Sequence, residues 1–109
     1  MKQILFMFVA VMVCSCKSQP DQVLVFTKTS GFRHDSIETG VKTLEELGQQ
    51  NEFVVTHTEN SEAFSLENLK NFQLVIFLNT TQDVLDETQQ AHFESYINNG
   101  GSFMGIHAA

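Results

Sequence analysis

Residues 74–78 read Leu-Val-Ile-Phe-Leu, five apolar side chains in succession. A strand that is covered on both faces of a parallel sheet has this continuous pattern, whereas a strand with one face in water alternates apolar and polar residues. A second run of the same kind, Val-Leu-Val-Phe, occupies residues 23–26. Two strands of this type predict a sheet that has helices on both sides.

The segments around these two runs alternate between helical and strand patterns. Apolar residues at 37, 41, 44 and 47 recur at helical spacing, which predicts a helix that Asp35 or Ser36 caps and that Gly48 ends. The alternation predicts an α/β fold, a doubly wound parallel sheet with right-handed crossovers. The other expected elements are a strand at 53–58, a short helix at 65–69, a helix that opens at Asp86 or Thr88 and has Ala91, Phe93, Tyr96 and Ile97 on its apolar face, and a strand at 103–106.

The composition is that of a folded domain with an acidic surface. The 109 residues are 42% hydrophobic and 17% charged, which is typical of one globular domain rather than of a disordered chain. Six Lys and Arg against thirteen Asp and Glu give a net charge of -7. Nucleic acid is therefore not an expected partner, because cationic side chains must replace the counterions of a phosphate backbone.

The amino-terminal residues predict export. Ten consecutive apolar residues, 4–13, are too few to span a bilayer, which takes roughly 20 residues, and they fit the core of a secretory signal. The next four residues, Val13-Cys14-Ser15-Cys16, resemble the lipobox of bacterial lipoproteins, with Cys16 as the lipidated residue. We expect a signal peptide at 1–15, a tether at 16–21 and a domain at 22–109. An ordinary cleaved signal with an incidental cysteine is the alternative.

This interpretation predicts an exported lipoprotein that Cys16 anchors on the periplasmic or cell-surface side of a membrane. Both cysteines of the chain, at 14 and 16, then lie outside the folded domain. The domain is left without a disulfide, a thiolate metal site or a cysteine nucleophile.

Polar residues follow the strands where such sheets bind their ligands, at the carboxyl ends of the strands. His34 closes the loop after the first strand and His107 follows the fourth, so strand order 2-1-3-4 would bring both to one edge. Imidazole titrates near neutral pH, which makes this pair our candidate for catalysis by proton transfer. The candidates for binding substrate hydroxyl groups are Arg33, Asn79, Thr80 and Thr81.

Each candidate also has a purely structural interpretation. His34 could cap the following helix, Arg33 could be an ordinary surface residue, and residues 79–81 could simply terminate a strand. For His57 in a strand and His92 on a helix, the structural or solvent-facing interpretation is preferred. Both interpretations are kept for Lys28 and Asp83.

The sequence carries no strong metal signature, and whether the histidine pair holds a metal or other cofactor is left open. A zinc site usually needs three protein ligands, and the two candidate histidines fall short of that number. Glu59 or Asp83 would have to complete the set, and spacing alone does not select either residue.

Three segments, residues 23–37, 77–85 and 100–109, resemble the ThuA-like (trehalose utilisation) family and occur in the family's order. The resemblance implies a flavodoxin-like sheet similar to that of class I glutamine amidotransferases. Those enzymes carry their nucleophile at an elbow of the form G-x-C-x-G. Here residues 105–109 read Gly-Ile-His-Ala-Ala, so His107 replaces the thiol and amidotransferase activity is not expected. Gln82 stands where relatives commonly have a glycine.

The resemblance also implies a role in carbohydrate metabolism. The expected partner is a small sugar, namely trehalose, a related glycoside or a keto-sugar, with His34 and His107 in one pocket. Because family domains are longer, we expect the chain to be the amino-terminal half of such a domain, truncated after the fourth strand. A non-catalytic sugar-binding or docking module is the alternative. A third reading is an inactive fragment with an aggregation-prone edge strand, and a homo-oligomer is left open.

Overall fold

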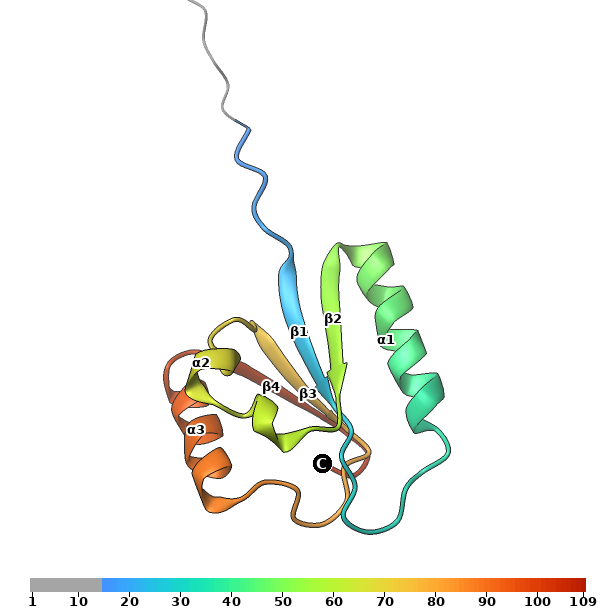
Figure 1. Cartoon of the computed structure of the whole chain (residues 1–109). Helices are drawn as coiled ribbons and strands as arrows, with labels where there is room; N and C mark the ends of the chain where they lie inside the picture. The colour runs from blue at the N-terminus through green and yellow to red at the C-terminus, as the bar shows by residue number, and fades with distance from the viewer. Residues whose placement is uncertain (1–14) are drawn as a thin grey trace, which may run out of the picture.

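The computed structural model describes residues 15–109 and contains a four-stranded parallel sheet (Figure 1). Residues 1–14 of the predicted signal peptide lie outside this range. The strand order is β2-β1-β3-β4, and every neighbouring pair is parallel, which confirms the predicted sheet. The strands are β1 (Asp21–Phe26), β2 (Phe53–Thr58), β3 (Leu74–Leu78) and β4 (Ser102–Ile106).

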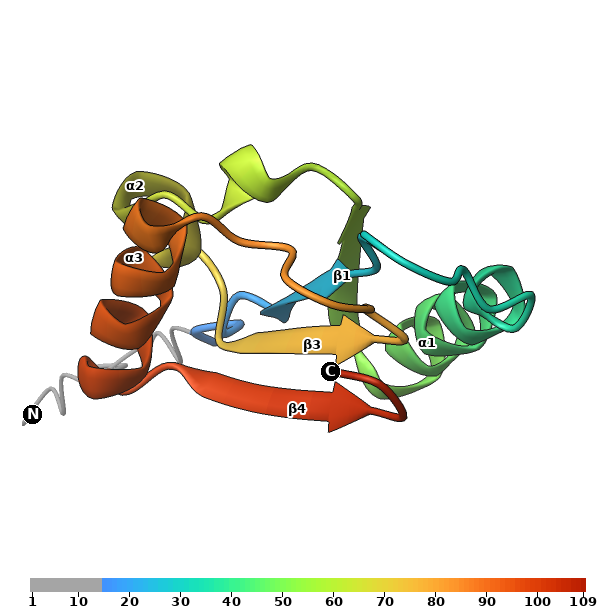
Figure 2. The same ribbon diagram turned by 90° about the horizontal axis from the view of Figure 1, so that it is seen from below.

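Helices cover both faces of the sheet, as the two doubly buried strands predict. Helix α1 (Ile37–Asn51) lies on one face, and α2 (Leu66–Leu69) and α3 (Glu87–Asn98) lie on the other (Figures 1 and 2). A single 3-10 turn, η1 (Ser61–Ala63), precedes α2. Among the described residues, no helix is both long and apolar enough to cross a bilayer.

Alternate residues of the central strands form two separate hydrophobic cores. Leu24 and Phe26 of β1 face α2 and α3, where Phe64 and Tyr96 cover them. The other set of β1 and β3 side chains packs against Ile37 and Val41 of α1; this set consists of Val23, Val25, Ile76 and Leu78. Because side chains of a strand alternate between faces, the wholly apolar segments 23–26 of β1 and 74–78 of β3 stabilise both layers at once.

The helix ends match the predictions at α3 and differ at α1. Asp86 caps α3 and forms a reciprocal capping box with Gln89. Helix α1, in contrast, does not end at Gly48 but continues to Asn51, and Glu52 adopts the left-handed conformation with φ 60°. Gly48 is instead buried inside the helix, where a Cβ would lie 2.6 Å from the Phe53 carbonyl oxygen. The glycine thus permits close packing of α1 on the chain that enters β2.

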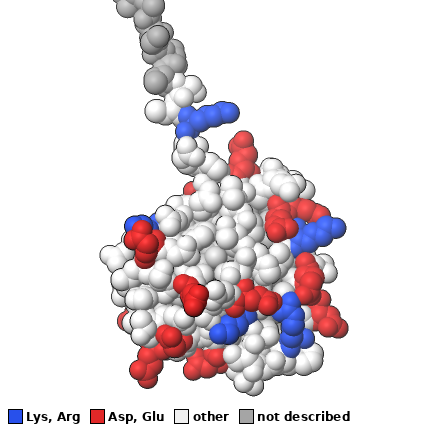
Figure 3. Space-filling model, viewed as in Figure 1, with Lys and Arg blue, Asp and Glu red and all other residues white. Residues whose placement is uncertain are grey.

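Charged side chains are spread over the surface. Acidic residues predominate around the face seen in Figure 3, in keeping with the net charge of -7. The exposed Cys16 lies in an irregular segment ahead of β1.

Strand β4 forms one edge of the sheet. It pairs only with β3 among the described strands, and its Phe103 and Met104 are about half exposed.

Candidate functional site

The two candidate catalytic histidines lie side by side at the carboxyl edge of the sheet. His34 ends the long loop after β1, and His107 follows β4 directly. Their ring centroids are 4.7 Å apart, and the two rings are nearly perpendicular at 83°. This is the juxtaposition that strand order 2-1-3-4 predicts, because β1 and β4 both flank β3 and all strands run in one direction.

His107 occupies a sharp turn. Its φ of 61° is in the left-handed region, which costs most side chains free energy and favours glycine. Asn79, which follows β3 in the same way, has a φ of 51°. Non-glycine residues held in this conformation are concentrated at functional sites, where the surrounding structure fixes them. His107 therefore forms an elbow directly after β4, and it lines a pocket at this edge of the sheet.

An open pocket of about 480 Å³ lies between this histidine pair and the start of α1. Its polar wall includes His34, His107 and Asn79, and its apolar residues include Leu78. The Asn79 side chain donates a hydrogen bond from Nδ2 to the Ser36 hydroxyl over 2.8 Å. Ser36 is the residue just before α1 but makes no side-chain capping bond, so the predicted cap is replaced by this contact. The complete lining is His34, Ser36, Thr39, Gly40, Leu78, Asn79, Ile106 and His107.

Arg33 does not line this pocket but lies between two carboxylates. Its guanidinium donates to Glu38, in the first turn of α1, and to Glu59, just after β2. These bonds, with Glu38 first, raise the pKa of Arg33 above its ordinary value. The pKa of Glu38 is lowered, first by a hydrogen bond from its own backbone N–H and then by Arg33. The paired arginine fixes the loop next to His34, and its predicted role in binding hydroxyl groups stays a prediction.

Thr80 and Thr81 follow Asn79 in the loop after β3, and their hydroxyl groups bond backbone carbonyls. The buried Thr80 hydroxyl donates to the Ala108 carbonyl over 3.5 Å, next to the His107 elbow. The Thr81 hydroxyl donates to the Phe32 carbonyl over 2.9 Å and accepts a bond from the Gly31 N–H. Both threonines therefore brace the two histidine-bearing segments, and contact with a substrate hydroxyl stays a prediction for them.

Sequence reasoning missed a hydrogen-bond network beside the arginine. Thr27, fully buried at the end of β1, bonds His57 Nε2 over 2.7 Å and donates to Glu59 over 3.4 Å. The sequence marks Thr27 and Glu59 as strand exits, but it does not show which of these side chains meet. His92, for which a structural role was preferred, bonds the Phe64 carbonyl through Nδ1 over 3.0 Å and joins α3 to the α2 side.

The suggested additional metal ligands are engaged elsewhere. Glu59 pairs with Arg33, and the Asp83 carboxylate accepts a bond from Gln90. Within residues 15–109, no group of three or more His, Cys, Asp or Glu side chains is placed to share a metal ion. Lys28, the remaining candidate, donates to the Ser61 hydroxyl over 2.7 Å and lies with Asp83 in a different pocket on the α2 and α3 side.

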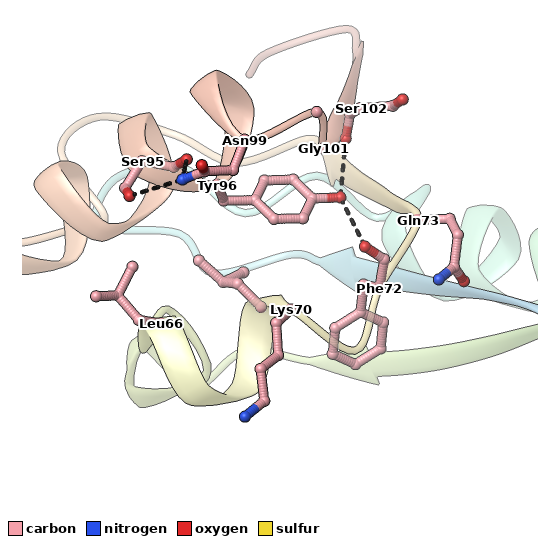
Figure 4. Close-up of a pocket in the computed structure, with 11 residues that line it drawn as sticks. Leu66, Lys70, Phe72, Gln73, Ser95, Tyr96, Asn99, Gly101 and Ser102 are labelled. Atoms are coloured by element: carbon pink, nitrogen blue, oxygen red, sulfur yellow. Dashed lines mark hydrogen bonds between the residues drawn. The ribbon is translucent and has the colours of Figure 1, made fainter.

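A larger pocket, of about 580 Å³, opens at the opposite edge of the sheet between α2 and α3 (Figure 4). Leu66 and Lys70 lie on its α2 side, and Tyr96 lies on its α3 side. The Tyr96 hydroxyl donates to the carbonyls of Phe72 and Ser102, and burial raises the pKa of this phenol. This pocket contains no histidine or carboxylate, so the smaller pocket at the carboxyl edge is the better candidate for chemistry.

Comparison with known proteins agrees with the fold and the motifs. Residues 22–109 match the family model described as ThuA, trehalose utilisation. The solved structure of a ThuA-like protein from Bacteroides uniformis superposes with a TM-score of 0.71 at 25% sequence identity, over 85% of this chain and 38% of that one. The chain thus spans less than half the length of this relative. No curated protein in the comparison matches it. By its family match, its strand order and its three motifs, the chain belongs to the ThuA (trehalose utilisation) family.

Proposed function

We propose that this chain acts in carbohydrate metabolism on trehalose, a related glycoside or a keto-sugar, and that His34 and His107 transfer protons to and from the substrate. The observation that carries the proposal is the 4.7 Å approach of the two imidazoles at the carboxyl edge of the sheet. Of two neighbouring imidazoles, one can hold a proton while the other accepts one. Reactions at sugar hydroxyl, carbonyl or glycosidic oxygens require such transfers.

The rest of the pocket supports an uncharged, hydroxyl-rich ligand. Asn79, Ser36 and Thr39 add amide and hydroxyl groups to the lining, and Leu78 and Ile106 add apolar surface. Pockets for small molecules combine a few placed polar groups with apolar walls in this way. The net charge of -7 disfavours an anionic substrate.

The proposal is tested by turnover of trehalose and of keto-sugars with the purified protein, followed by proton NMR of the sugar. His34→Ala and His107→Ala should each lower turnover by a factor of about 100 or more, as loss of a proton-transfer group does. His92→Gln is the matched control, because this histidine lies on α3 and bonds the Phe64 carbonyl instead. Unchanged turnover in both alanine variants would contradict an enzymatic role. Sugar binding without turnover in the unsubstituted protein would support the binding module instead.

We further propose that the protein is exported and anchored through a lipid on Cys16. Support comes from the lipobox-like sequence and from the exposed position of Cys16 in an irregular segment ahead of β1. Cells fed a labelled fatty acid should yield labelled, membrane-associated protein. Cys16→Ser should abolish both the label and membrane association, whereas Cys14→Ser should preserve them. Equal labelling of the Cys16→Ser variant would contradict the anchor.

A further inference from the structure

Phe32 is the most exposed large hydrophobic side chain of residues 15–109. It is 71% exposed, although each apolar group left in water forgoes the free energy of burial. Its ring lies against His34, with centroids 4.9 Å apart and planes at 82°. His34 thus contacts the Phe32 ring and the His107 ring, each nearly perpendicular to its own, which places Phe32 next to the histidine pair of the candidate site.

The loop that carries Phe32 is fixed on both sides of this residue. Before it, the Ser30 N–H donates to the Thr81 carbonyl over 3.0 Å, and the Ser30 hydroxyl donates to the Asp83 carbonyl over 2.8 Å. The Phe32 carbonyl itself accepts from Thr81, and the following Arg33 is held by two carboxylates. Because these contacts hold the backbone, an exposed ring at this point is preorganised for contact with a ligand.

We propose that Phe32 is a specificity-determining residue that stacks against the apolar face of a cyclic sugar held at the histidine pair. The inference rests on the proposed function. An aromatic face carries partial negative charge, and the C–H groups on one face of a pyranose present the opposite sign together with apolar surface. The hydroxyl groups at the edge of the same sugar then lie toward His34 and His107. An open-chain polyol also offers hydroxyl groups but has no such ring face.

The test measures affinity by NMR titration of the purified protein with trehalose and with sorbitol, an open-chain polyol. Phe32→Ala should weaken trehalose binding about tenfold, the size of a lost aromatic contact, and leave sorbitol binding unchanged. Phe32→Trp should retain trehalose binding, and Phe32→Leu should not. Leu66→Ala, which removes an exposed apolar side chain that lines the pocket at the opposite edge, should bind both compounds as the unsubstituted protein does.

The outcomes separate the two proposals. If the unsubstituted protein binds trehalose and Phe32→Ala binds it equally well, the role of Phe32 is overturned and the proposed function stands. If Phe32→Ala weakens sorbitol binding as much as trehalose binding, ring stacking is likewise overturned. If the unsubstituted protein binds neither trehalose nor, in the same titration, a related glycoside or a keto-sugar, the proposed function fails and the inference fails with it.

Discussion

At the scale of single residues, the backbone conformation of His107 allows the contribution of its imidazole to function to be measured apart from the effect of the backbone on stability. A left-handed conformation costs an L-residue about 1–2 kcal/mol and costs glycine nothing. His107→Gly should therefore be more stable than His107→Ala by about 1 kcal/mol in denaturant unfolding, while both lack the imidazole. The neighbouring Ala108 has no positive φ, so Ala108→Gly should be destabilising because glycine raises the conformational entropy of the unfolded chain. Equal stability of the two His107 variants would contradict the elbow geometry.

The hydrogen bond from the Glu38 backbone N–H and the ion pair with Arg33 predict a dependence of stability on pH. The pKa of Glu38 is lowered in the fold from an ordinary value of 4.5, so its folded form binds a proton less readily than its unfolded form. Its contribution to stability is present above pH 4.5 and is lost as pH falls through the lower folded pKa. Unfolding midpoints measured from pH 6 downward should fall more steeply for the unsubstituted protein than for Glu38→Gln. Parallel curves would show that the carboxylate makes no such contribution.

The sequence predicted that the two histidines meet, but it did not predict the hydrogen bonds among Thr27, His57 and Glu59. His34 and His107 are predicted together because each lies after a predicted parallel strand, and strand order 2-1-3-4 places these strand ends at one edge. Contacts such as that between Thr27 and His57 depend on the register of β1 with β2, which pairs Val25 with His57. Sequence pattern alone carries no information on that register, since both strands also accommodate other pairings.

At the scale of elements, the turn from α3 to β4 depends on close packing. A Cβ on Gly101 would lie 2.3 Å from ring atoms of the buried Tyr96, whose hydroxyl is fixed by two carbonyls. Gly101→Ala should therefore lower the free energy of unfolding by about 2 kcal/mol, as overpacking does. Gly31→Ala is the control, because its Cβ would meet only the flexible end of Gln82. A similar, small effect of both substitutions would contradict this packing.

The start of α3 and the end of α1 show which helix-end signals can be recognised in the sequence. The prediction names Asp86 or Thr88 as the start of α3, and the structure has Asp86 as the cap, in a reciprocal box with Gln89 that satisfies backbone N–H groups within the segment itself. Gly48 was expected to end α1, yet the left-handed residue is Glu52. Contact between α1 and β2 is a tertiary effect, and it places Gly48 where no larger residue fits. A residue that caps a helix can be predicted from the sequence. A glycine required by packing cannot be distinguished in the sequence from a glycine that ends a helix.

At the scale of the whole molecule, the parallel sheet separates the proposed anchor from the candidate site. The segment that bears Cys16 joins the amino end of β1, while the histidine pair lies at the carboxyl edge (Figure 1). A lipid on Cys16 would therefore leave the pocket facing away from the membrane. This arrangement follows from the direction of β1, whose amino end joins the Cys16 segment and whose carboxyl end leads to His34.

The most direct test of the site is an NMR spectrum of the purified protein with all four imidazoles labelled with nitrogen-15, recorded as trehalose is added. The site at the carboxyl edge predicts that the signals of His34 and His107 shift together. His92, which bonds the Phe64 carbonyl beside α2, should not respond, and His57, held by Thr27, should respond less than the pair. Shifts confined to His57 or His92, or none at His34 and His107 while trehalose binds, would contradict the assignment.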